Sequence, residues 1–147
     1  NPSRALALTK LMAAKFPRNG RHILVLADTP IATRVAIIEG LAANLDQGAF
    51  DALIAIADDA APQVRAACIA AIAQRPGVAS DELVMRGLGD ADWTVRASAA
   101  LAAGRVRLAR AEPELRALRH DEHWWVRLRA SEALLVLESA DRDTVAA

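Results

Sequence analysis

The sequence repeats itself with a period of 31 residues. Four aspartates lie 31 residues apart, and an arginine follows each of them after six positions. No insertion interrupts the series, and a fixed period of this length is typical of proteins that stack copies of one small unit. The repeat therefore predicts a modular fold. The two series are Asp28, Asp59, Asp90 and Asp121, and Arg34, Arg65, Arg96 and Arg127.

Each unit predicts two short helices. After the aspartate, apolar residues recur every three or four positions, which is the spacing of one helix face; in the last unit they are Val126, Ala130, Leu134 and Leu137. In the third unit we expect this second helix to end at Gly104. A first helix should precede each aspartate, and residues 4–16 should be the second helix of a further unit. The predicted first helices are 22–27, 50–57, 81–88 with Ser80 as its cap, and 111–119 with Pro113 in its first turn.

The composition favours close-packed helices over strands. Alanine supplies 35 of the 147 residues, whereas tyrosine is absent and only two phenylalanines occur. Such short helices are marginal alone and persist when neighbouring pairs bury one another's apolar faces. We therefore predict one all-α domain, an α-solenoid of stacked antiparallel helix pairs, excised from or ending a longer protein. Its parts would be a half repeat at 1–17 and repeats at 18–47, 48–78, 79–109 and 110–140.

Three of the repeated strings resemble HEAT repeats, in the short form of about 30 residues also found in phycobilin lyase subunits. They begin at Asp59 (DAAPQVRAA), Asp90 (DADWTVRASAAL) and Asp121 (DEHWWVR). The resemblance implies a right-handed solenoid and a non-catalytic scaffold that presents its concave face to a partner protein or a neighbouring domain. Two alternatives remain open: a phycobilin-lyase-like accessory or chaperone subunit, and a HEAT-like DNA-binding protein of the DNA glycosylase type.

The aspartates and arginines of the repeat are interpreted as a structural ladder. An aspartate at the start of the second helix can cap free N–H groups and complement the helix dipole. The arginine six residues later could bridge that turn to the turn of the next unit. A contact that recurs in every unit is typical of architecture, whereas a binding site is usually local.

The candidate binding site is the stripe of the second helices that the apolar core does not use. The resemblance implies that these helices line the concave surface. In the last unit the stripe is Trp125, Arg129, Glu132 and Val136, and in the third unit it is Thr94, Ser98, Leu101 and Arg105. We expect partner contacts to be strongest around Trp125, Arg129 and Arg105.

The three tryptophans receive different predictions. Trp93 and Trp124 share a repeat position with Ile31 and Pro62, so we expect them to pack between neighbouring units. The equivalents of Trp125 are small or polar, which indicates a solvent-facing position. Trp125 would then be covered by a following unit that is missing here, or be available to a partner.

Other chemistries find little support in the sequence. Basic and acidic residues balance at 18 each, which argues against a nucleic-acid partner despite eight arginines between residues 96 and 129. No apolar run is long enough for a membrane span. The turn at His120, Asp121, Glu122 and His123 has the wrong spacing for a metal site, and Cys68 has the pattern of a small buried residue. We expect no cofactor, no catalytic site and a cytoplasmic location.

Overall fold

The computed structural model describes residues 30–43 and 45–146, and within them all regular secondary structure is helical. The prediction of an all-α protein is confirmed. The chain divides into two compact units, residues 1–75 and 76–147. The predicted half repeat at 1–17, the helix at 22–27 and Asp28 lie outside the described residues.

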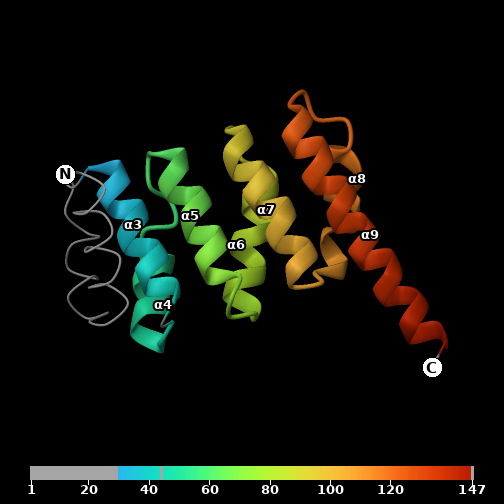
Figure 1. The fold of residues 1–147 in the computed structure, drawn as a ribbon, viewed down its shortest axis with the longest axis horizontal. Coiled ribbons are helices and arrows are strands. Elements are labelled where there is room, and N and C mark those ends of the chain that lie inside the picture. Colours follow the sequence, from blue (N-terminus) through green and yellow to red (C-terminus); the bar gives the residue numbers. More distant parts are fainter. Residues whose placement is uncertain (1–29, 44, 147) are drawn as a thin grey trace. The chain divides into compact units, whose positions relative to one another are not determined.

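The first unit contains three described helices (Figure 1): α3 (Ile31–Ala42), α4 (Gln47–Ala55) and α5 (Pro62–Ile72). α5 packs on both α3 and α4. The core of the first unit consists of aliphatic side chains that are almost completely buried, namely Ile37, Ile38, Leu41, Leu53, Val64 and Ile72.

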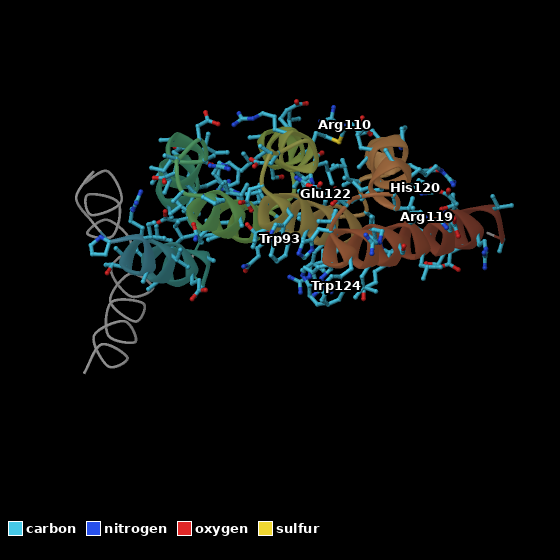
Figure 2. The ribbon with its side chains drawn as sticks, turned by 90° about the horizontal axis from the view of Figure 1, so that it is seen from above. Trp93, Arg110, Arg119, His120, Glu122 and Trp124 are labelled. Carbon is cyan, nitrogen blue, oxygen red and sulfur yellow. The ribbon has the colours of Figure 1, made fainter. Side chains whose placement is uncertain are left out.

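The second unit has two layers of helices (Figures 1 and 2). One layer holds α6 (Val78–Leu88) and α8 (Glu112–Leu118), the latter preceded by the short 3-10 helix η1 (Ala109–Ala111). The other layer holds α7 (Trp93–Arg105) and α9 (Trp124–Ala146). α6 packs on α7 and α8 packs on α9, while α7 and α9 pack extensively on each other. The most completely buried aliphatic side chains of the second unit's core are Val84, Val95, Leu115 and Val126.

The repeat spacing marks where the second helices begin. α3, α5, α7 and α9 start at Ile31, Pro62, Trp93 and Trp124, each three residues after an aspartate of the series. The prolines of the turns suit this geometry, since Pro62 occupies the first turn of α5 and Pro113 the first turn of α8.

Two first helices begin earlier than predicted. α4 starts at Gln47 and not at residue 50, because Asp46 accepts a hydrogen bond from the backbone N–H of Ala49 at 2.7 Å and caps the helix there. α6 starts at Val78, so the predicted cap at Ser80 is wrong. The Ser80 hydroxyl lies inside the first turn and donates a hydrogen bond to the carbonyl of Gly77 at 2.8 Å.

Gly104 does not end its helix, and this prediction is also wrong. α7 continues to Arg105, and Gly104 lies in its last turn, facing Ala133 of α9. A Cβ atom at Gly104 would lie 3.0 Å from Cα and 3.1 Å from Cβ of Ala133. The glycine is therefore explained by the close approach of two helix backbones.

Candidate functional site

The turn before each second helix has the same hydrogen bonds in three places. Each aspartate carboxylate accepts a bond from the backbone N–H two residues later, at 2.8 Å for Asp59 and 2.9 Å for both Asp90 and Asp121. Each following arginine donates through Nη1 to the carbonyl of that aspartate and to the next carbonyl. These distances are 2.9 and 3.0 Å for Arg65, 3.0 Å twice for Arg96, and 2.8 and 3.1 Å for Arg127.

Two arginines also reach the next aspartate of the series. Arg34 donates to the carboxylate of Asp59. Arg96 forms a two-pronged ion pair with Asp121, with Nε 2.8 Å from Oδ2 and Nη2 3.0 Å from Oδ1. The Arg96 and Asp121 side chains are only 11% and 7% exposed. These contacts are architectural, since they join one turn to the next and leave little of either side chain free.

The ion pair changes the acidity of both groups. Burial alone would raise the pKa of Asp121, but hydrogen bonds from Arg96 and from the His123 N–H, together with the positive charge of Arg96, outweigh it. The pKa of Asp121 therefore lies below the ordinary value for aspartate. The hydrogen bond to Asp121 raises the pKa of Arg96.

The side chains of α7 and α9 enclose a groove on the second unit. Its first part is a cavity of about 300 Å³ lined by Trp93, Thr94, Ala97, Ser98, Leu101, Trp125 and Arg129. Its second part, of about 250 Å³, is lined by Leu101, Gly104, Arg105, Arg107, Arg129, Glu132, Ala133 and Val136. Leu101 and Arg129 belong to both parts, so we treat them as one α7–α9 groove. The structure thus brings together all six binding residues predicted from the sequence, namely Thr94, Ser98, Arg105, Trp125, Arg129 and Glu132.

Aromatic rings stand at one end of the groove. The rings of Trp93 and His123 are stacked, with centroids 3.6 Å apart and planes 5° from parallel. His123 also stacks on Trp124 at 6.3 Å, and Trp124 meets Trp125 edge to face at 5.1 Å. The guanidinium of Arg129 lies 4.4 Å from the ring centroid of Trp125, within the range of a cation–π interaction. The groove therefore has one aromatic end.

Trp93 packs in part on the following repeat, since its ring stacks on His123, whereas the predicted packing of Trp124 is wrong. The two tryptophans are 38% and 59% exposed, and in Figure 2 both lie on the side formed by α7 and α9. Both rings stack with His123. Trp125, for which solvent exposure was predicted, is half-buried beside Arg129.

An exposed apolar stripe continues from Trp124 along α9. Leu128 and Leu135 follow it at helical spacing, and both are exposed. The equivalent positions of α7 are Ala97 and Gly104, which are buried. Within the described part of the chain, no element covers this side of α9.

The arginines between residues 96 and 129 do not gather on one face. Arg110 pairs with Glu82 at 2.7 Å and Arg116 with Glu112 at 2.6 Å, away from the groove. In Figure 2, Arg110 and His120 lie on the side of α8, opposite Trp93 and Trp124. The run of basic residues is therefore divided between the two sides of the unit.

Neither the histidine turn nor Cys68 offers an evident reactive centre. Among the residues that the structure describes, no three His, Cys, Asp or Glu side chains are grouped to hold a metal ion. His123 is engaged with two tryptophan rings, and its Nδ1 accepts a hydrogen bond from the backbone N–H of Trp125 at 3.3 Å. Burial, with a smaller effect from the charge of Asp59, raises the pKa of the Cys68 thiol to about 12.

Sequence reasoning missed several residues of the groove. The repeat position of Trp93 predicts packing, and no helical stripe predicts Ala97, Gly104, Arg107 or Ala133 as lining residues. What these residues share is their position where α7 faces α9, and that position depends on how closely the two helices approach each other. A helical stripe read from one helix does not contain that information.

Comparisons with known proteins add no family assignment. No protein-family model matches the sequence, and no curated protein is significantly similar to it. In the part of the chain that the structure covers, no helix combines the length and the apolar character required to cross a bilayer.

Proposed function

We propose that this chain is a non-catalytic protein-interaction module that binds a segment of a partner protein in the α7–α9 groove. The observation that carries the proposal is that six stripe residues from two helices line two adjoining cavities that share Leu101 and Arg129. Such a groove suits binding through shape and a few anchors, among which tryptophan and arginine are the most effective. Trp125 and Arg129 are the proposed anchors.

The turn geometry supports a HEAT-like architecture around this groove. The same carboxylate and arginine contacts recur at Asp59, Asp90 and Asp121, as expected for units that are copies of one helix pair. We therefore include in the proposal a right-handed solenoid of 31-residue repeats. Its rigidity would fix the groove before the partner arrives, which reduces the entropy cost of binding.

The test selects ligands for the whole chain from a random peptide library and measures their affinity by fluorescence anisotropy. The double variant Trp125→Ala/Arg129→Ala should bind the selected peptides at least tenfold more weakly. It should lose only about 1–2 kcal/mol of folding stability, because its cation–π contact and its exposed ion pair with Glu132 are individually weak.

The matched control is Arg116→Ala, which removes an arginine–glutamate pair from α8 outside the groove. It should leave peptide affinity unchanged. A stability loss of about 3 kcal/mol or more in the double variant would identify Trp125 as a packing residue. If no selected peptide depends on Trp125 and Arg129, the groove is not the binding surface.

A further inference from the structure

The charged residues that line the α7–α9 groove do not balance. Arg129 donates to Glu132 at 2.9 Å, which uses the one carboxylate among the lining residues. Arg105 and Arg107 are exposed at the end of α7, and among the described residues neither side chain has a hydrogen bond or an ion pair. The groove therefore holds two positive charges without a counter-charge.

Arg129 also has an unused hydrogen-bond donor. Its Nε atom is buried and has no acceptor within the described residues, although Nη1 is bonded to Glu132. A buried donor without a partner costs free energy that a bound acceptor would recover. The guanidinium already occupies the face of Trp125, so the cation-binding position of that ring is taken. A negatively charged or neutral acceptor fits this place, and a cation does not.

The two ends of the groove differ in chemistry. Trp93, Ala97 and Leu101 make one end apolar, and Arg105 and Arg107 make the other end cationic. Thr94 and Arg105 are eleven residues apart on α7, which corresponds to about 16 Å along the helix. An extended peptide covers this distance with about five residues.

We propose, building on the function proposed above, that the groove binds an acidic peptide segment with one large apolar side chain. The apolar side chain lies between Trp93 and Trp125. Carboxylates within about five residues of it meet Arg129, Arg105 and Arg107. Charge complementarity gives the segment its orientation, because only one direction places its acidic part at the end of α7.

The charges favour a polypeptide over a nucleic acid. The chain has no net charge, with 18 basic and 18 acidic residues. Arg96, Arg110 and Arg116 are each paired with a carboxylate, so they do not extend the cationic end into a longer track. Nucleic-acid binding normally requires such a track.

The test uses the peptides selected by the whole chain, each synthesised with a fluorescent label in two forms. One form keeps its Asp and Glu residues, and the other replaces them with Asn and Gln. We expect the acidic form to bind about tenfold more tightly at low salt and to lose this advantage as salt is added. The variant Arg105→Ala/Arg107→Ala should weaken the acidic form about tenfold and leave the amide form unchanged. Arg116→Ala should change neither.

Three results would overturn the inference. If peptides that depend on Trp125 and Arg129 bind equally well in both forms, the groove binds protein but does not select acidic segments. If no peptide depends on those two residues, the proposed function fails as well. If a single-stranded oligothymidine binds the same groove more tightly than any acidic peptide, the occupant is a nucleic acid.

Discussion

The ion pair between Arg96 and Asp121 offers the most direct test of what holds the second unit together. Arg96→Ala removes four hydrogen bonds, two to the Asp121 carboxylate and two to the carbonyls of Asp90 and Ala91. Arg127→Ala is a matched control. Arg127 makes the equivalent carbonyl contacts but, in the described part of the chain, it has no carboxylate partner.

The difference in unfolding free energy between the two variants measures the contribution of the ion pair between Arg96 and Asp121. Removing one member of a buried ion pair costs about 3–5 kcal/mol, and this pair lies near the surface, so we expect about 3 kcal/mol for Arg96→Ala. The exposed Arg127 loses two weak hydrogen bonds, worth about 1 kcal/mol together. Arg96→Ala should therefore be about 2 kcal/mol less stable than Arg127→Ala, a factor of roughly 30 in the folding equilibrium.

Urea unfolding, monitored by circular dichroism at several pH values, measures the size of this stability difference and tests whether the ion pair causes it. Because the pKa of Asp121 is lowered in the folded state, the stability it contributes is complete above its unfolded pKa of about 3.9 and is lost as the pH falls through the folded value. The difference in unfolding free energy between the two variants should thus shrink as the pH falls below about 4. A difference that persists in acid would assign the effect to packing of the Arg96 stem, and variants within about 0.5 kcal/mol of each other at neutral pH would refute the contribution of the ion pair.

Two further predictions concern buried positions. Gly104→Ala should lower the free energy of unfolding by about 1 kcal/mol, because crowding against Ala133 outweighs the gain in helix propensity. In urea unfolding, the double variant Gly104→Ala/Ala133→Gly should be more stable than the sum of the two single changes predicts, because the second change removes the crowding. Additive effects would show that the helices separate freely at this point. The Cys68 thiol should react with a disulfide reagent at pH 8 only as fast as the chain unfolds, and a fast reaction in native buffer would contradict its burial and its pKa of about 12.

The sequence predicted the second helices better than the first ones. The aspartate and the arginine of each turn lie six residues apart and bond to local backbone, so their spacing alone indicates where α5, α7 and α9 begin. The start of α6 depends on a choice between Gly77 and Ser80 as the cap. Both residue types are accepted at that position, and the structure selects Gly77.

The exposure of the tryptophans could not be predicted from their repeat position. Trp93 and Trp124 share that position with Ile31, and an apolar residue in register indicates packing only when the space opposite is large enough. α7 and α9 come so close at Gly104 and Ala133 that a Cβ atom added to the glycine would lie 3.0 Å from Cα of Ala133. Trp93 and Trp124 instead stack with His123 and stay partly exposed. Packing of this kind depends on both helices, so it cannot be predicted from the residue pattern of one helix.

The same close approach explains why the groove forms where it does. Gly104 and Ala133 bring the last turn of α7 near the middle of α9, while the larger side chains of Trp93 and Trp125 lie near the beginnings of these helices. Large residues beside a close contact leave a hollow between them, since the backbones cannot move apart to fill it. The small residues that define the contact and the aromatic residues that define the hollow are therefore parts of one feature. Substitutions that separate the helices should change peptide binding even when they leave every groove residue in place.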